Sequence, residues 1–168
     1  MPCAAFSLFM KKYDSISVVI PTLNEEGNIE ALVRRLDATF SADQVLYELI
    51  FIDDNSTDKT RDILRTLAIK YPISVFLKKG TKGKAQSLIE GFAHARFDVV
   101  GMIDADLQYP PEAMPGMIRK IQEGFDIVVV NRAQRHVSFL RKLFSKTFAF
   151  IFVRMLHGFN FDVQAGLK

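Results

Sequence analysis

The chain of 168 residues is long enough to form one domain with a sizeable core, and 49% of its residues are hydrophobic. Its net charge of +3 is small, and its basic residues do not form a stripe with stacking aromatic residues, so nothing indicates nucleic-acid binding. The single cysteine, Cys3, excludes an intrachain disulfide and suits a reducing compartment. No run of about 18 apolar residues is present, so no segment is predicted to span a bilayer.

Short β-branched runs alternate along the chain with stretches whose apolar residues have helical spacing. The predicted strands are residues 16–20, 47–52, 73–77, 98–103 and 126–130. The predicted helices are residues 26–40, 58–70, 84–95 and 110–124, the last with an irregular start because of Pro115. This order predicts an α/β fold in which helices cover a mostly parallel sheet. Residues 1–14 are expected to be an N-terminal extension and residues 15–168 to form one domain.

Ligands of parallel sheets bind beyond the carboxyl ends of the strands, where the strand order switches. Five polar loops follow the predicted strands and should converge on that edge: residues 21–25, 53–54, 78–83, 104–108 and 131–132. Lys78, Lys79, Lys82 and Lys84 form a basic cluster in this set that would suit phosphates, although solvated faces are commoner. No Gly-x-Gly-x-x-Gly or Gly-Lys-Ser/Thr loop is present, which disfavours dinucleotide binding and P-loop ATPase chemistry.

Asp104 and Asp106 follow the strand predicted at residues 98–103, and side chains two apart in a strand project to the same side. The Gln108 amide oxygen could join them. Two carboxylates held so close repel unless a cation lies between them, and oxygen ligands suit Mg²⁺ or Mn²⁺ completed by substrate phosphates. The stretch therefore predicts a metal–diphosphate site. The alternative is a solvated Asp-rich turn before a proline-started helix.

Asp53 and Asp54 are acceptor-only carboxylates that suit the N–H groups of a base or the hydroxyls of a ribose. Their alternative role is capping the helix that follows the second strand, which Ser56, Thr57 and Asp58 could already do.

Four blocks of the sequence resemble, in order, those of family 2 glycosyltransferases. They are residues 19–26 (VIPTLNEE), 52–58 (IDDNSTD), 104–111 (DADLQYPP) and 162–168 (DVQAGLK). The closest resemblance is to the polyprenyl-phosphate branch, which includes dolichyl-phosphate mannose and glucose synthases and bactoprenol glucosyltransferases. The resemblance covers residues 15–168 and implies a GT-A fold, an inverting transfer and a divalent cation, Mg²⁺ or Mn²⁺.

The resemblance also implies roles for single residues. Those around the nucleotide-sugar would be Pro21, Leu23, Glu25, Ile52, Asp53, Asp54, Asp104, Ala105, Asp106, Gln108, Arg132 and Lys168. Within this set, Asp106 and Gln108 would hold the metal, and Asp104 and Ala105 would touch the ribose or the diphosphate. Asp104 is also a metal candidate on the spacing argument above. Leu23 stands where many relatives have Tyr, so stacking on the base would be weaker.

The implied reaction is in-line attack by a polyprenyl phosphate on the anomeric carbon of a UDP- or GDP-sugar. Asp106, Arg132 and Asp162 are the catalytic candidates. A lipid phosphate is already anionic and needs no strong base, so Arg132, Arg135 or Lys168 would instead hold it. If the acceptor is a saccharide hydroxyl, Asp162 is the candidate base. A catalytically silent nucleotide-sugar-binding subunit is a further alternative.

Residues 138–157 predict a helix that is basic in its first half and apolar nearly all round after Thr147. This composition fits a helix at a membrane interface, although a core helix or a partner-binding helix has the same pattern. We therefore expect a protein on the cytoplasmic face of a membrane, either peripheral or anchored. Relatives in this branch often continue through further helices, so we expect a natural protein that extends beyond Lys168. The sequence leaves the sugar, the nucleotide and the oligomeric state open.

Overall fold

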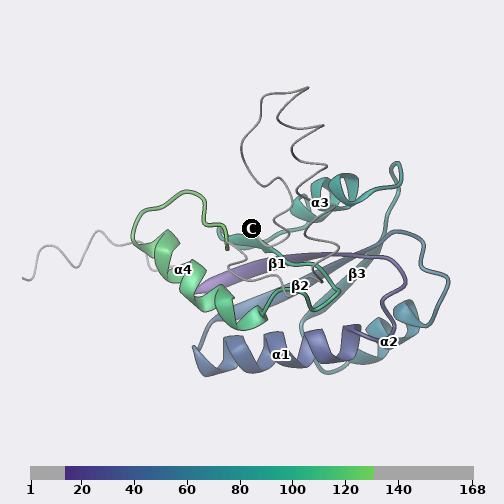
Figure 1. The fold of residues 1–168 in the computed structure, drawn as a ribbon, viewed down its shortest axis with the longest axis horizontal. Helices are drawn as coiled ribbons and strands as arrows, with labels where there is room; N and C mark the ends of the chain where they lie inside the picture. The colour runs from purple at the N-terminus through teal and green to yellow at the C-terminus, as the bar shows by residue number, and fades with distance from the viewer. Residues whose placement is uncertain (1–13, 131–168) are drawn as a thin grey trace, which may run out of the picture. The chain divides into compact units, whose positions relative to one another are not determined.

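A computed structural model describes residues 14–130 of the chain. In chain order its elements are β1 (Ser15–Thr22), α1 (Ile29–Ala42), β2 (Leu46–Asp53), α2 (Thr60–Leu67), β3 (Ile73–Leu77), α3 (Lys84–Phe92), β4 (Val100–Met102), η1 (Pro111–Ala113) and α4 (Met114–Gln122). The predicted α/β class is confirmed, and Figure 1 shows the helices on both sides of one sheet. The predictions for residues 1–13, the helix at 138–157, Arg132, Arg135, Asp162 and Lys168 lie outside the described residues.

The four described strands form one parallel sheet in the order β3-β2-β1-β4. The order reverses at β1, which lies between β2 on one side and β4 on the other. In a sheet of this kind the loops after β1 and β4 diverge and leave a crevice between them. The topology therefore brings the loops after residues 22, 53 and 102 to the same edge, as the sequence pattern predicted.

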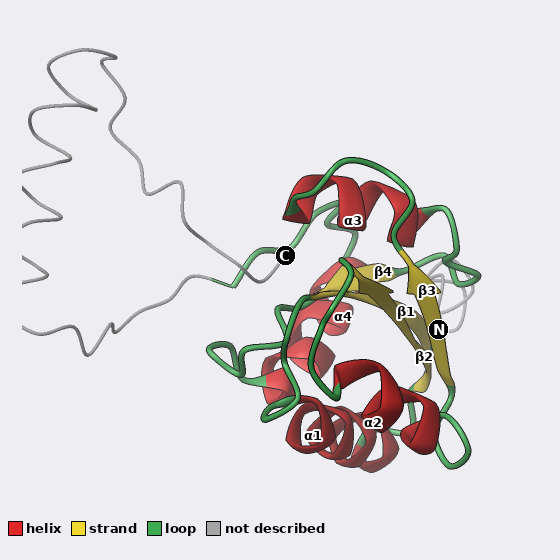
Figure 2. Cartoon of the chain, turned by 90° about the vertical axis from the view of Figure 1, so that its right-hand side faces the viewer, coloured by secondary structure: helices red, strands yellow, loops and turns green. Residues whose placement is uncertain are grey.

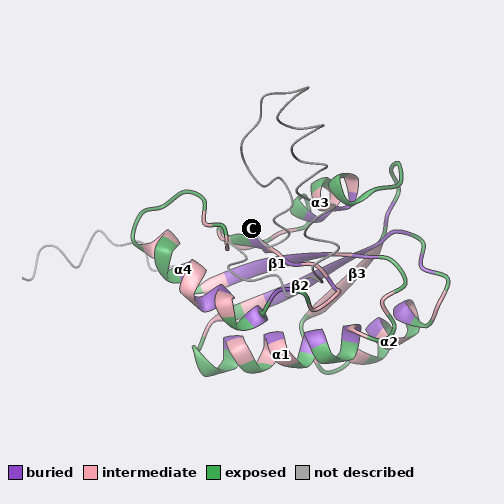
Figure 3. Ribbon diagram, viewed as in Figure 1, coloured by how far each residue is buried: buried purple, intermediate pink, exposed green. Residues whose placement is uncertain are grey.

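Helices cover the two faces of the sheet unequally, as Figure 2 shows. The larger core cluster joins alternate residues of β1, among them Val18 and Ile20, to α1, α2 and α4. The smaller cluster, centred on Val19, packs on the α3 side. Period-two alternation along β1 thus divides its side chains between two cores, and both lie in buried parts of the sheet (Figure 3).

The contact of α3 with the sheet is very close at Gly91. A Cβ atom added there would lie 2.2 Å from Cγ1 of Val19 and 3.2 Å from Cγ1 of Ile52. Only a residue without a side chain allows this approach, which holds α3 against β1 and β2. Because α3 starts at the carboxyl edge of the sheet, this packing also fixes the position of its first turn.

A buried polar cluster ties the sheet together at the opposite end of the strands. The hydroxyl of Ser17 donates a hydrogen bond to Glu48 at 2.6 Å, and Arg96 pairs with Glu48 through its backbone N–H and its guanidinium. Burial alone would raise the pKa of Glu48, but the hydrogen bonds from Ser17 and Arg96 outweigh this effect and lower its pKa below the ordinary value of 4.5. Glu48 therefore stays ionised and joins β1 and β2 to the segment before β4.

The predicted strand at residues 126–130 is wrong, because these residues form no ladder within the described part of the chain. Ile127 is 79% exposed, and residues 125–128 line a hollow of about 540 Å³ beside β4 and α4. β-branched composition indicates a fit to a pleated surface but names no pairing partner. The fourth strand is also shorter than predicted, ending at Met102 rather than Ile103. The irregular start of the last helix is confirmed as η1.

Within residues 14–130, every helix is too short or too polar to cross a membrane.

We predict that Gly91→Ala destabilises the protein by about 1–3 kcal/mol, because the added methyl group overpacks the contact with Val19. Gly27→Ala is the matched control, since nothing lies within 4 Å of a Cβ atom added there. Its effect should stay within about 0.5 kcal/mol. Urea unfolding of both variants measures the difference, and equal midpoints would contradict the close packing of α3.

We predict that Glu48→Gln lowers the free energy of unfolding at pH 7 by about 1–3 kcal/mol, because it removes charged hydrogen bonds to Ser17 and Arg96. The pKa of Glu48 is lower in the folded protein than in the unfolded chain. Its contribution is therefore complete above the unfolded value and is lost as the pH falls through the folded value. The gap between wild type and variant should narrow below about pH 4.5 in urea titrations. A gap that stays constant with pH would exclude this role.

Candidate active site

A cleft of about 390 Å³ lies beyond the carboxyl ends of β1, β2 and β4. It is lined by Pro21, Thr22, Leu23, Glu25, Asp54, Lys82, Gly83, Lys84, Ser87, Asp104, Ala105 and Asp106. The loops after all four described strands and the first turn of α3 thus meet at one place. Their convergence confirms the sequence-based expectation for four of the five polar loops, and the fifth lies outside the described residues.

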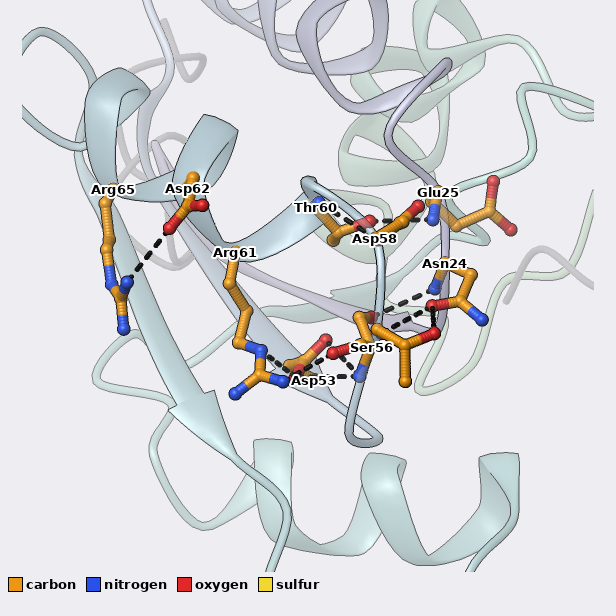
Figure 4. A network of polar contacts seen from close by, with 10 residues as sticks. Asn24, Glu25, Asp53, Ser56, Asp58, Thr60, Arg61, Asp62 and Arg65 are labelled. Atoms are coloured by element: carbon orange, nitrogen blue, oxygen red, sulfur yellow. Dashed lines mark hydrogen bonds and ion pairs between the residues drawn. The ribbon is translucent and has the colours of Figure 1, made fainter.

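The loops after β1 and β2 are joined by hydrogen bonds, as Figure 4 shows. Asn24 donates its backbone N–H to the Ser56 hydroxyl at 2.9 Å, and its side-chain oxygen accepts the N–H of Thr57 at 2.8 Å. The N–H of Glu25 donates to the Thr60 hydroxyl at 2.8 Å. Several polar residues of both blocks therefore hold the cleft in shape, and their side chains are already used within the protein.

Asp53 belongs to this supporting network and does not line the cleft. Its buried carboxylate accepts the backbone N–H of Ser56 and pairs with Nε of Arg61 at 3.3 Å (Figure 4). Ile52 is also absent from the cleft lining, because its side chain is fully buried in the smaller core cluster. The two residues support the loop after β2, and neither of them lines the cleft; their predicted roles at the nucleotide stay predictions.

Asp54 faces the cleft and is held by Lys78, whose side chain is fully buried. Nζ of Lys78 lies 2.5 Å from Oδ2 of Asp54, and the N–H of Gly83 donates to the same oxygen at 3.1 Å. The hydrogen bond from Lys78 lowers the pKa of Asp54 more than burial raises it, so Asp54 is ionised. The other oxygen, Oδ1, is buried and has no hydrogen-bond partner in the described structure.

An unpaired buried carboxylate oxygen is costly, so a ligand donor that reached Oδ1 of Asp54 would remove this cost. Base N–H groups and ribose hydroxyls are donors of the required kind. The predicted contact of Asp54 with a base or a ribose stays a prediction.

Asp104 and Asp106 both line the cleft, but not because they alternate along a strand. β4 ends at Met102, and Leu107 adopts a left-handed backbone conformation with φ 57° in a tight turn. The N–H of Gln108 donates to Oδ1 of Asp106 at 3.0 Å within this turn. Gln108 lies outside the cleft lining, and its predicted place beside the metal stays a prediction.

The cleft fits a hard divalent cation in part. Asp104 and Asp106 offer oxygen atoms only, and Oδ1 of Asp104 already pairs with a cation, the ammonium of Lys84, at 2.5 Å. Among the described residues, no three His, Cys, Asp or Glu side chains lie close enough together to hold a metal ion. The two aspartates could therefore supply only part of a coordination shell, which phosphate oxygens and water would complete, as is common for Mg²⁺.

Seven of the predicted nucleotide-sugar residues meet in the cleft: Pro21, Leu23, Glu25, Asp54, Asp104, Ala105 and Asp106. Cleft residues that the sequence analysis did not assign to the site are Thr22, Lys82, Gly83, Lys84 and Ser87. The signal for Lys82 and Lys84 was the basic cluster that follows the third strand. Because this cluster lies at the predicted ligand edge, the two lysines could have been assigned to the cleft.

Comparison with known proteins agrees with this architecture. Glucosyl-3-phosphoglycerate synthase from Mycobacterium tuberculosis, solved with phosphoglyceric acid, matches with a TM-score of 0.62 and 26% identity over 91% of this chain and 55% of that chain. A mannosyltransferase from Pyrobaculum calidifontis, solved with GDP-Man and Mn²⁺, matches with a TM-score of 0.54 and 25% identity over 68% of this chain and 33% of that chain. The fold is that of GT-A glycosyltransferases, as predicted.

The profile of glycosyl transferase family 2 matches residues 17–165, and the chain belongs to that family. It is 39% identical to a dolichol-phosphate mannosyltransferase of Pyrococcus furiosus over 78% of this chain and 38% of that protein. It is 38% identical to an undecaprenyl-phosphate 4-deoxy-4-formamido-L-arabinose transferase of Pectobacterium carotovorum over 79% of this chain and 41% of that protein. These relatives confirm the resemblance to the polyprenyl-phosphate branch. The chain spans about two fifths of their length.

We predict that Lys78→Met lowers the free energy of unfolding by about 3–5 kcal/mol, because it leaves the buried carboxylate of Asp54 without its counter-ion. The double variant Lys78→Met/Asp54→Asn should recover part of this loss, since it removes the unpaired charge. Lys79→Met, which changes the adjacent exposed lysine, should act within about 0.5 kcal/mol. Urea unfolding measures all three, and equal effects at the two lysines would contradict the ion pair.

Proposed function

We propose that this protein transfers a sugar from a UDP- or GDP-sugar to a polyprenyl phosphate in a metal-dependent, inverting reaction. The observation that carries the proposal is the arrangement of Asp54, Asp104 and Asp106 around one cleft, together with the unpaired oxygen Oδ1 of Asp54. The names of its relatives, transferases acting on dolichol phosphate and undecaprenyl phosphate, support the acceptor class.

In this proposal the donor lies across the cleft with its nucleoside toward β1 and β2. Asp54 accepts a hydrogen bond from the base or the ribose, and Leu23 and Pro21 form an apolar wall at the same end. The diphosphate lies toward Asp104 and Asp106, which follow β4 on the other side of the crevice. Solved neighbours contain GDP-Man or UDP, so both nucleotides remain candidates.

A bound Mg²⁺ or Mn²⁺ would neutralise the charge that grows on the leaving diphosphate. Asp104 and Asp106 would hold this cation. Two solved neighbours that contain Mn²⁺ support this assignment. Arg132, Asp162 and Lys168 remain proposals for the phosphates and the acceptor, as the sequence predicted.

A polyprenyl phosphate acceptor brings its own anionic oxygen, so the attack needs orientation more than a general base. Its lipid chain would place the reaction at a membrane surface, which agrees with the expected peripheral or anchored location at the cytoplasmic face. Transfer to a saccharide hydroxyl would need a base instead. Asp162→Asn should then abolish turnover, whereas transfer to a polyprenyl phosphate should tolerate this change better.

We predict that the protein binds UDP or GDP more tightly with Mn²⁺ than without it, and that Asp106→Asn removes this metal dependence. Asp54→Asn should weaken nucleotide binding with and without Mn²⁺, because it changes the group that faces the nucleoside. Isothermal titration calorimetry of both nucleotides into the three proteins measures these effects. Absence of binding to folded wild-type protein would overturn the proposed donor site.

Turnover is tested with radiolabelled UDP- and GDP-sugars and a polyprenyl phosphate presented in detergent micelles. We expect wild-type protein to move the radiolabel into the lipid, which is extracted into an organic solvent. Asp106→Asn should abolish this labelling of the lipid. Donor hydrolysis without lipid labelling would contradict the proposed acceptor.

A further inference from the structure

Lys84 is the first residue of α3, and its side chain crosses the cleft to Asp104. Nζ of Lys84 lies 2.5 Å from Oδ1 of Asp104. The side chain of Lys84 is 46% exposed and that of Asp104 is 21% exposed. A pair this accessible contributes little stability and can open at small cost.

The backbone that carries Lys84 is fixed, while its side chain is not. Gly83 donates its N–H to the buried Asp54 and accepts a hydrogen bond from Lys78 at 3.2 Å. Gly91 then holds the far end of α3 against the sheet. The backbone of Lys84 is therefore held at the edge of the cleft, while rotation about its side-chain bonds lets the ammonium group reach different partners.

The charges around Lys84 favour a change of partner when a ligand binds. The first turn of α3 contains no acidic residue, and no side chain caps it. A cation there opposes the helix dipole, so Lys84 gains from a negative partner. In the described structure Asp104 provides that partner, and a phosphate in the cleft would provide a second one.

We propose that Lys84 is an internal counter-ion for Asp104 that a divalent cation displaces, after which Lys84 pairs with the donor diphosphate. This inference rests on the proposed function. Lys84 is then a positioning and binding residue with two states, one for the empty cleft and one for the loaded cleft. The exchange keeps Asp104 paired with a positive charge in both states and adds a positive group to the diphosphate when it arrives.

The test is Mn²⁺ binding in the absence of nucleotide, followed by UDP or GDP binding at saturating Mn²⁺. Lys84→Met removes the competing ammonium, so Mn²⁺ alone should bind about two- to fivefold more tightly than to wild type. The nucleotide should bind more weakly to the same variant by a similar factor. Lys84→Arg retains a cation for Asp104 and should bind Mn²⁺ as wild type does.

Lys82→Met is the matched control, because it removes the same charge from the same cleft while the Lys84–Asp104 pair stays in place. Its Mn²⁺ affinity should change less than that of Lys84→Met. In an Asp104→Asn background, Lys84→Met should no longer strengthen Mn²⁺ binding. Circular dichroism verifies that each variant is folded.

Several results would overturn the inference. If wild type binds the nucleotide with Mn²⁺ but Lys84→Met binds Mn²⁺ no more tightly, the exchange is wrong and the donor site stands. Equal gains in Lys82→Met and Lys84→Met would show a general charge effect and exclude the specific pair. If wild type binds neither Mn²⁺ nor nucleotide, the donor site and the exchange both fail.

Discussion

The buried ion pair between Lys78 and Asp54 is the interaction on which the cleft depends. A fully buried ammonium requires a counter-ion, and Lys78 has Asp54 at 2.5 Å and the carbonyl of Gly83 at 3.2 Å. The pair joins the residue after β2 to the residue after β3, and Gly83, which bonds both of them, links the pair to the start of α3. It also keeps Asp54 ionised, with Oδ2 committed to Lys78 and Gly83 and with Oδ1 buried and unpaired in the described structure.

The polar residues of the two N-terminal blocks divide into a supporting set and a cleft-lining set. Asn24 of the loop after β1 donates its N–H to the Ser56 hydroxyl of the loop after β2, and the N–H of Ser56 donates to the Asp53 carboxylate. These polar groups are used within the protein. Asp54 faces the cleft. A site that binds a flexible nucleotide-sugar needs its loops held in place before the donor arrives. Some polar residues of these blocks would therefore support the loops without touching the donor.

The sequence was sufficient to predict β1 and β2, whose side chains are mostly buried, and the partly buried β3, since all three contain apolar runs bounded by polar residues. It could not predict the left-handed turn at Leu107, between Asp106 and Gln108, because leucine gives no signal for that conformation. Nor could it distinguish Asp53 from Asp54. Their different roles are set by Arg61 and Lys78, which pair with one aspartate each.

We propose that Asp104 and Asp106 hold a divalent cation beside the first turn of α3. Paramagnetic broadening by Mn²⁺, added with UDP or GDP to ¹⁵N-labelled protein, locates a bound cation in the fold. If the cation binds between these aspartates, amide signals of residues 83–84 and 104–107 broaden first, while those of Glu48 and Arg96, at the opposite end of the sheet, persist. Broadening centred on any other part of the chain would contradict it.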